Sequence, residues 1–169
     1  MTSNAQLFDW CVAHRVPGFA GVFSADTLPV VQCPDDWCCI VNHSPSNSPT
    51  GGTHWLACRI RGRRAWWFDS FGLDIDSQLE DWVMGAGEDP PTHFARWLRE
   101  SGVTKVTVNH EDLQNVGSDV CGLYACFFCA HGMPPWPGFS PDNQARNDML
   151  IRELVVVPAP GTGAGRKLK

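Results

Sequence analysis

The sequence predicts an α+β domain with one helix buried at its centre. Three observations lead to this expectation. Segments with the two-residue period of strands and segments with helical spacing both occur along the chain. A block at 120–130 is apolar without interruption. The chain has 169 residues, 43% of them hydrophobic, so we expect a single domain over 1–157 and a flexible tail rich in glycine and proline over 158–169.

The N-terminal half is expected to contain one helix and three strands. Asn4 is the predicted cap of a short amphipathic helix that ends near His14. Residues 16–29 contain a glycine and a proline that interrupt regular structure, so this stretch is expected to be a loop-rich connection. Strands are expected at 37–41, 55–60 and 65–68, the last two joined as a hairpin, and an exposed loop is expected at 44–52.

The C-terminal half is expected to be mainly helical. Helices are expected at 76–84 and 92–100, and a strand at 103–108. The block at 120–130 carries apolar residues all round, which is typical of a buried helix, and Cys121 stands in its first turn. Ser140 followed by Pro141 indicates the start of a last helix, which runs to about Leu154.

Composition and charge argue against several classes of function. A formal net charge of −5 gives no general attraction to nucleic acid or anionic membranes, and the one dense basic cluster is at 59–64. No apolar run approaches the roughly 20 residues that span a bilayer, and residues 1–10 do not resemble a signal peptide. We expect a soluble, unexported protein. Most of its eight cysteines are expected to be reduced and buried.

Four residues, each at the end of an expected element or in a polar loop, suggest nucleophilic chemistry. His54 follows a glycine pair and precedes a strand, and Asp69 follows an aromatic strand. Gln114 lies in a polar loop, and Cys121 opens the buried helix. Taken singly, each has a structural interpretation: a surface or capping histidine, a turn-forming aspartate, a loop glutamine and a packed cysteine. The ordered set within one domain favours a site.

Each of these residue types is what thiol catalysis requires. A thiol has a pKa of about 8.5, and a helix N-terminus or a neighbouring imidazolium lowers that pKa. A carboxylate such as Asp69 holds the imidazole of His54 in one tautomer. The backbone N–H of Cys121 and the side chain of Gln114 are candidate donors to a developing oxyanion.

A zinc-binding interaction module is the alternative from a different class. Its ligands would be Cys121, Cys126, Cys129 and His131, or Cys33 with Cys38 and Cys39. The first set lies in an expected uninterrupted helix, which lacks the turn that brings two thiolates onto one metal. We therefore expect no metal.

The motifs resemble those of the adenovirus-type endopeptidases (adenain), and more distantly the ubiquitin-like-protein proteases of the same superfamily. The resemblance runs from about residue 18 to 131 and is strongest at 51–57, at 68–72, and at Gln114 with 121–123. It implies a mixed β-sheet packed against helices, with a central helix that carries the nucleophile at its N-terminus. It also implies that His54 is the general base, Asp69 the orienting acid, Gln114 the oxyanion donor and Cys121 the nucleophile.

This chain departs from the adenovirus pattern in three ways. It has Asp69 where those enzymes have glutamate, which keeps a carboxylate and matches the ubiquitin-like branch. It has Val103 where they have a cysteine that binds an activating viral peptide through a disulfide. They are basic and stimulated by DNA, whereas this chain is acidic. No cofactor is expected, neither a DNA cofactor nor a disulfide-linked activator, and a non-covalent peptide activator stays open.

The resemblance also implies cleavage after glycine, in Gly-x-Gly or Gly-Gly sequences of polypeptide substrates. An aromatic residue next to the base narrows the entrance, and Trp55 stands there. Trp55, Gly52 and Gly122 are the expected substrate-binding residues. We expect a monomeric viral enzyme that processes virion precursors inside the host cell, in the nucleus, cytoplasm or virion. The alternative is a protease of ubiquitin or a ubiquitin-like modifier, and no membrane partner is expected.

Overall fold

The computed structural model describes residues 2–49, 52–77 and 93–157 and has a mixed five-stranded sheet in the order β1-β2-β3-β4-β5. The strands are β1 (Phe19–Ser24), β2 (Trp37–Asn42), β3 (Trp55–Arg61), β4 (Arg64–Phe68) and β5 (Lys105–Val108). The described helices are α1 (Asn4–Ala13), α3 (Phe94–Glu100), α4 (Cys121–His131) and α5 (Gln144–Leu154). The outer strand pairs are parallel and the inner ones antiparallel. The predicted α+β class with a mixed sheet and helices is therefore confirmed.

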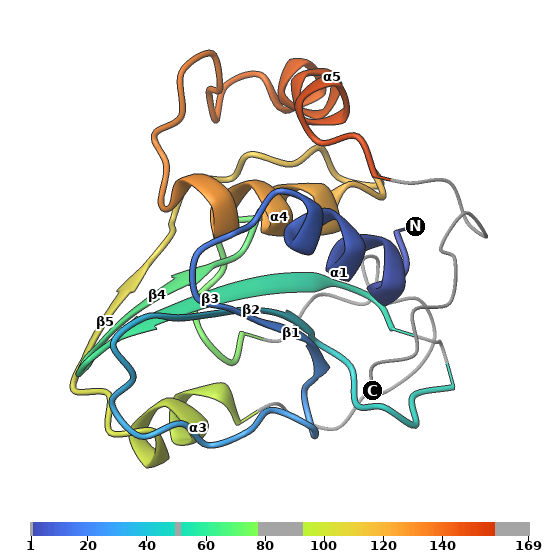
Figure 1. Ribbon diagram of the computed structural model, residues 1–169. Helices are drawn as coiled ribbons and strands as arrows, with labels where there is room; N and C mark the ends of the chain where they lie inside the picture. The colour runs from blue at the N-terminus through green and yellow to red at the C-terminus, as the bar shows by residue number, and fades with distance from the viewer. Residues whose placement is uncertain (1, 50–51, 78–92, 158–169) are drawn as a thin grey trace.

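Helices cover both faces of the sheet. Figure 1 shows α1, α4 and α5 on one side and α3 on the other. Successive residues of β2 point to opposite sides, so Cys38 and Ile40 pack with α4, whereas Cys39 and Val41 pack with α3. Both sides of the central strands are consequently buried, which explains why β2 is an apolar run rather than an alternating one.

The first helix begins as predicted but has a different cap. Ser3, not Asn4, is the N-cap, and it forms a capping box with Gln6 in which each side chain bonds the other residue's backbone N–H. Leu7, Trp10 and Cys11 form the buried side of α1. This side packs against α4 and β1.

The prediction of a loop-rich connection at 16–29 is wrong, because β1 lies within it. The strand is easy to miss because Gly21 interrupts its register against β2 and has φ +147°, a conformation that favours glycine. β1 is also an edge strand whose residues are mostly half-buried, so its sequence carries a weak apolar pattern.

The hairpin of β3 and β4 is confirmed. Arg61 pairs with Arg64 at its end, and Ala57 pairs with Phe68 toward its open side. The expected exposed loop after β2 is only partly exposed, since Ser44 and Gly52 are buried. The predicted strand at 103–108 is shorter in the structure, where β5 begins at Lys105.

Asp76 was the predicted start of a helix, but in the structure it caps another one. Its carboxylate accepts the backbone N–H groups of Phe94 and Ala95 at 2.6 and 3.0 Å, in the first turn of α3. Asp76 and Ser77 are not helical, and the rest of the predicted helix at 76–84 lies outside the described residues. So do the first residue of the predicted helix at 92–100 and the expected tail at 158–169.

The two C-terminal helices differ in burial. Eight of the residues of α4 are buried, including Cys121 at its start. α5 buries only Asn147, Asp148 and Ile151, and it begins at Gln144 after an Asn143 cap, later than the Ser-Pro pair predicted. None of the described helices is long and apolar enough to cross a membrane.

Candidate active site

The predicted residues lie at the ends of two strands and one helix, on the same side of the sheet where β3 begins and β4 ends. His54 immediately precedes β3, Asp69 immediately follows β4, and Cys121 is the first residue of α4. β3 and β4 are antiparallel, so the start of one lies beside the end of the other. α4 packs across β3 and β2.

The His54 ring is held by a carboxylate and by an aromatic ring. Its Nε2 atom lies 2.9 Å from Oδ1 of Asp69, and both side chains are buried. The backbone N–H of Phe71 donates to the same oxygen at 2.8 Å, which fixes the carboxylate. The Phe71 ring stacks on the imidazole with centroids 5.0 Å apart. Because Asp69 uses Nε2, Nδ1 is the ring nitrogen left for Cys121.

Burial and two neighbouring groups set the pKa of His54. Burial opposes the charged ring, but the charge of Asp69, its hydrogen bond to the ring and the interaction with the Cys121 thiol outweigh that effect. Together they raise the pKa of His54 to about 10. The site therefore favours an imidazolium, and an imidazolium next to a thiol stabilises the thiolate.

Cys121 lies at an end of α4 that no side chain caps. The N-cap residue is Val120, which has no acceptor on its side chain, and only 4% of the Cys121 surface is exposed. The N–H groups of Leu123 and Tyr124 donate to the Val120 carbonyl. Those of Cys121 and Gly122 come earlier in the helix, where no intrahelical acceptor exists. They form a ready binding site for developing negative charge.

Gln114 is fully buried and is fixed by two serines. The hydroxyl of Ser70 donates to Oε1 of Gln114 at 2.7 Å. Nε2 of Gln114 donates to the carbonyl of Ser118 at 2.9 Å, in the segment that leads into α4. The amide therefore has one orientation. Nε2 carries two hydrogens, and Ser118 uses one of them.

Two adenovirus proteins are similar in sequence to this chain. A protein named Protease from Bovine adenovirus C serotype 10 is 27% identical over 142 residues, which cover 79% of this chain and 67% of that protein. A protein named Protease from Bovine adenovirus 2 is 31% identical over 102 residues, which cover 59% of this chain and 47% of that protein. The chain is therefore similar to adenovirus proteases over most of its length. The resemblance read from the motifs is thereby confirmed, although no family model matches the chain.

Trp55 and Gly122, two of the expected substrate-binding residues, contact each other. A Cβ placed on Gly122 would lie 3.1 Å from Cδ1 of Trp55 and 3.0 Å from Cδ2 of Leu7. The indole N–H of Trp55 donates to the carbonyl of Thr2 at 3.1 Å, and the ring is buried. Gly122 thus lets the first turn of α4 approach Trp55 closely. The substrate-binding roles of both residues stay predictions.

Gly52 also has a packing role beside any role in substrate binding. It has φ +99°, and a Cβ there would lie 2.6 Å from Nδ2 of Asn42. Close to this contact, the backbone N–H of His43 donates to the carbonyl of His54 at 2.8 Å. Gly52 therefore allows the segment before His54 to lie against the end of β2.

Three supporting residues of this adenovirus protease relative were not predicted from the sequence. Ser70 orients Gln114, Phe71 stacks on His54, and Asn109 donates through Nδ2 to the carbonyl of Asp69 at 2.7 Å. The first two directly follow Asp69 in the sequence, and this adjacency was the only signal for them. Asn109 lies at the start of a polar loop and offers no comparable signal.

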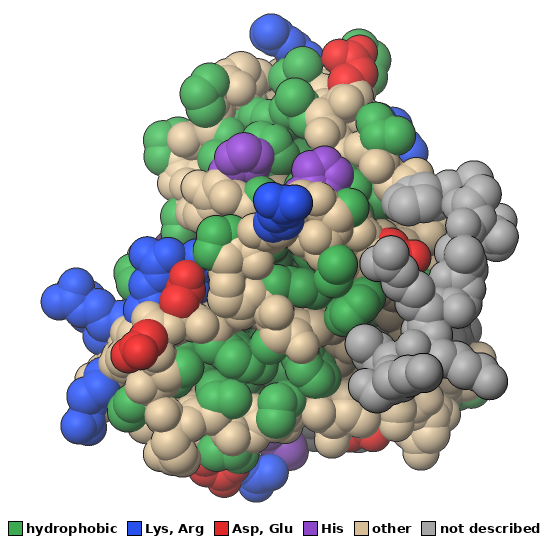
Figure 2. Space-filling model, in the orientation of Figure 1, with side chains coloured by type: hydrophobic (Ala, Val, Ile, Leu, Met, Phe, Trp, Pro, Cys, Tyr) green, Lys and Arg blue, Asp and Glu red, His purple; other side chains and the backbone are tan. Residues whose placement is uncertain are grey.

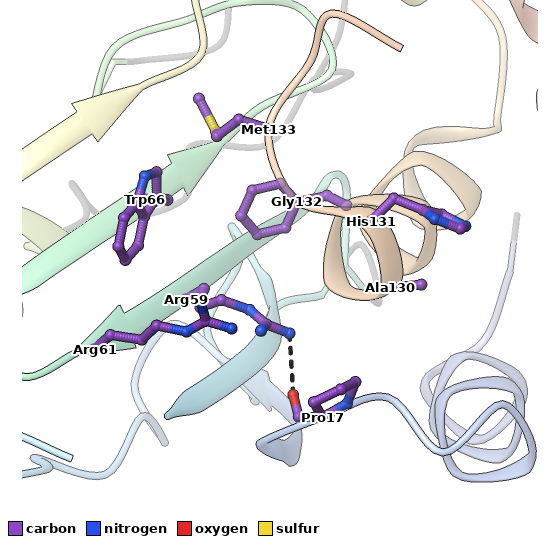
Figure 3. A pocket seen from close by; sticks show the side chains of 9 residues that line it. Pro17, Arg59, Arg61, Trp66, Ala130, His131, Gly132 and Met133 are labelled. Atoms are coloured by element: carbon purple, nitrogen blue, oxygen red, sulfur yellow. Dashed lines mark hydrogen bonds between the residues drawn. The ribbon is translucent and has the colours of Figure 1, made fainter. Parts of the chain in front are cut away.

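A cavity of about 350 Å³ lies at the other end of α4 and contains none of the four candidate residues. Figure 3 shows Arg59, Arg61 and Trp66 on the strands and Ala130, His131 and Gly132 at the end of the helix, with Pro17 below. Lys and Arg side chains gather close by, near the turn between β3 and β4 (Figure 2). This cavity is a feature separate from the candidate site.

The cysteines of the zinc alternative have other neighbours in the structure. Within the described residues, no three His, Cys, Asp or Glu side chains come together as a metal site. Cys126 and Cys129 lie in the uninterrupted helix α4 and are buried. Their neighbours are other thiols and backbone carbonyls: Cys126 Sγ lies 3.9 Å from Cys11 Sγ, and Cys129 Sγ lies 3.8 Å from the Cys39 carbonyl.

Proposed function

We propose that this chain is a cysteine endopeptidase of viral origin. The observation that carries the proposal is the buried pair of His54 Nε2 and Asp69 Oδ1, 2.9 Å apart, next to a cysteine that opens a helix. Its relatives are named proteases, which supports hydrolysis of peptide bonds as the reaction. In this proposal Cys121 is the nucleophile.

The proposed mechanism has two halves, formation of a thioester and its hydrolysis, and the same residues act in both. The Cys121 thiolate attacks the scissile carbonyl carbon, and the N–H of Cys121 and Nε2 of Gln114 donate to the resulting oxyanion. The His54 imidazolium gives its proton to the leaving amine, and the C–N bond breaks to leave a thioester. A water then loses a proton to His54 and attacks the thioester, which releases the acid and the thiol. Asp69 stabilises the imidazolium throughout.

We propose glycine as the residue before the cleaved bond. The reacting groups are deeply buried: 4% of the surface of Cys121 and 1% of that of His54 are exposed. Burial of this degree favours a substrate backbone without a Cβ at the point of attack. The proposed walls of the entrance are Trp55, which follows His54, Gly52, which lies two residues before it, and Gly122, which follows Cys121.

Processing of virion precursor proteins is the proposed biological role, because both relatives are proteases of adenoviruses. The second candidate is cleavage of ubiquitin or a ubiquitin-like modifier, which the aspartate at position 69 favours through its similarity to that branch. Reporters made of a folded modifier and of short Gly-Gly peptides separate the two. Cleavage of the folded modifier alone would support the second candidate.

We further propose that the enzyme acts without a disulfide-linked peptide or a DNA cofactor. Val103 is buried among the apolar residues packed with α3, where it offers no thiol. The net charge of −5 opposes binding to DNA. Turnover on a Gly-x-Gly reporter should be measurable in reducing buffer without added peptide. Turnover that appears only with a viral peptide would replace this proposal with a reversible activator.

Covalent labelling tests the central assignment. A peptide vinyl sulfone that ends in Gly-Gly should modify Cys121, and peptide mapping should find little label on the other seven cysteines. Cys33 is the exposed cysteine and serves as the internal control for simple accessibility. Label mainly on Cys126 or Cys129 would overturn the assignment.

A further inference from the structure

The backbone on both sides of Gln114 is bound by two buried polar residues of α5. Leu113 accepts a hydrogen bond at its carbonyl from Nδ2 of Asn147 at 3.0 Å. The N–H of Asn115 points at the carboxylate of Asp148, with distances of 3.4 and 3.3 Å to its two oxygens. Asn147 is 1% exposed and Asp148 is 7% exposed. Burying a polar side chain costs free energy unless the side chain forms hydrogen bonds, so these bonds account for the burial of the two residues.

The same residues connect Gln114 to the helix that carries Cys121. Tyr124 lies three residues after Cys121 in α4, and its hydroxyl lies 3.0 Å from both the Leu113 carbonyl and Oδ1 of Asp148. In Figure 1 the segment that leads into α4 passes between α4 and α5. Tyr124 and Asp148 therefore join three pieces of the chain: α4, α5 and the segment with Gln114.

The turn that follows β4 also holds the segment, through Ser70. The carbonyl of Ser70 accepts the N–H groups of Leu113 and Gln114 at 2.8 and 3.0 Å, and the Ser70 hydroxyl orients the Gln114 amide. Contacts from α5 thus complete a two-sided clamp around one residue. An oxyanion donor must be placed within a few tenths of an ångström, because a displacement of about 1 Å costs on the order of a hundredfold in rate.

We propose that Asp148 and Tyr124 are positioning residues for Gln114, so that α5 fixes the geometry of the oxyanion site without contacting the substrate. This inference rests on the proposed function, since it gives Gln114 the role of oxyanion donor. Asn147 supports the same arrangement, and it also ties the loop before α5 in place through the carbonyl and N–H of Ser140. α5 is therefore part of the reaction machinery rather than only a cover for α4.

Kinetics of Asp148→Ala and Tyr124→Phe test the proposal. Each should lower kcat about 10-fold with KM within about twofold, because the clamp acts on a donor to the transition state. The rate at which iodoacetamide alkylates Cys121 should stay within about twofold, because alkylation forms no oxyanion. Asp148→Asn keeps an oxygen acceptor and should recover most of kcat. Met149→Ala, on the exposed side of α5, is the matched control and should leave kcat unaltered.

A double-mutant cycle distinguishes positioning from general stabilisation. In a Gln114→Ala background, Asp148→Ala and Tyr124→Phe should have no further effect on kcat. Reductions that multiply with that of Gln114→Ala, or an unaltered kcat in folded Asp148→Ala and Tyr124→Phe, would overturn the inference while leaving the proposed function in place. Failure of the proposed function would look different, because the unsubstituted chain would then show no turnover or Gln114→Ala would have no effect. Tyr124→Phe keeps the test available if Asp148→Ala does not fold.

Discussion

At the N-terminal end of α4, Cys121 faces His54 and no side chain caps the helix, whereas at the C-terminal end a half-buried arginine binds the last turn. Arg59 donates through Nη2 to the carbonyls of Cys129 and Pro17 at 2.8 and 3.0 Å. Its Nη1 lies 3.2 Å from Oδ2 of Asp36. One helix thus has a first turn without a side-chain cap and a last turn in which the carbonyl of Cys129 accepts a hydrogen bond from Arg59.

The two ends of α4 therefore serve different purposes: the N-terminal end carries the reactive group, and the C-terminal end stabilises the fold. Open N–H groups lower the stability of a helix end but leave donors for a reacting oxyanion. A satisfied C-terminal end holds α4 on the sheet and keeps Cys121 at a fixed place. Substitutions at the two ends should therefore have opposite signatures, with loss of turnover at one and loss of folding free energy at the other.

The largest expected effect is that of Cys121→Ala on turnover. Removing a nucleophile costs on the order of a millionfold in kcat in enzymes where it has been isolated, so no turnover should be detected. The free energy of unfolding should change by less than about 1 kcal/mol, because the side chain is small and sits at the helix edge. Reporter cleavage and denaturant unfolding of the same preparation check both parts. Substantial cleavage by the purified variant would show that Cys121 is not the nucleophile.

At the opposite end of α4, Arg59→Met should lower the free energy of unfolding by about 1–3 kcal/mol. The substitution removes the donor to the partly buried carbonyl of Cys129 and to the exposed carbonyl of Pro17, and it removes one partner of Asp36. The kcat of the folded variant should stay within about twofold.

Arg61→Met is the matched control for Arg59→Met. Arg61 pairs with the same carboxylate, but its side chain is 53% exposed, so its loss should cost less than about 1 kcal/mol. Equal losses of stability for the two arginines would contradict the distinction drawn here.

The two ends also differ in how well the sequence predicts them. His54, Asp69 and Cys121 stand at ends of elements, in an order and in company that resemble a known family, so the candidate site was predictable. Arg59 looked like one member of a basic cluster at 59–64. Nothing in its neighbours indicates that it turns inward to bind Cys129, because that contact joins residues 70 apart in sequence.

The same contrast holds for the fold: elements that depend on neighbouring residues were predictable, and those that depend on residues distant in sequence were not. The hairpin of β3 and β4 follows from two strand-like segments separated by a short turn that contains a glycine, and it was predictable. β1 depends on pairing with a neighbour in parallel and carries a glycine irregularity, so its local pattern was weak. Asp76 has the residue type of a helix cap, but the helix that it caps begins 18 residues later. Ser70, next to Asp69, shows that positions beside a predicted residue are where supporting contacts are best sought.

A smaller effect is expected for Gln114→Ala at the N-terminal end. Loss of one oxyanion donor should lower kcat about a hundredfold, with little change in the alkylation rate of Cys121. Arg59→Met should leave both quantities unchanged in the folded protein, which sharpens the contrast between the ends. Single-turnover kinetics with a Gly-Gly reporter measure the loss. Unaltered turnover of the Gln114→Ala variant would show that Gln114 has a structural role and is not an oxyanion donor.

The most gradual expected effect is a dependence of stability on pH that arises at one end only. The pKa of His54 is raised to about 10 in the folded protein, against about 6.5 for an unperturbed histidine. The folded state therefore binds more protons than the unfolded state between these values. The associated stabilisation is fully present below about pH 6.5 and is lost as the pH rises toward 10, with a slope of at most about 1.4 kcal/mol per pH unit.

The test is to measure the free energy of unfolding as a function of pH, and this quantity reports most directly on His54 between about pH 6.5 and 8. Above that range the unfolded thiols begin to ionise, whereas burial raises the pKa of Cys39 and Cys58 in the folded state, which adds a second loss of the same sign. Asp69→Asn removes the charge that raises the pKa of His54 and should flatten the slope. Arg59→Met should keep the slope while lowering the whole curve, because an arginine stays charged throughout. A slope that disappears in Arg59→Met but persists in Asp69→Asn would place the titrating group at the wrong end of α4.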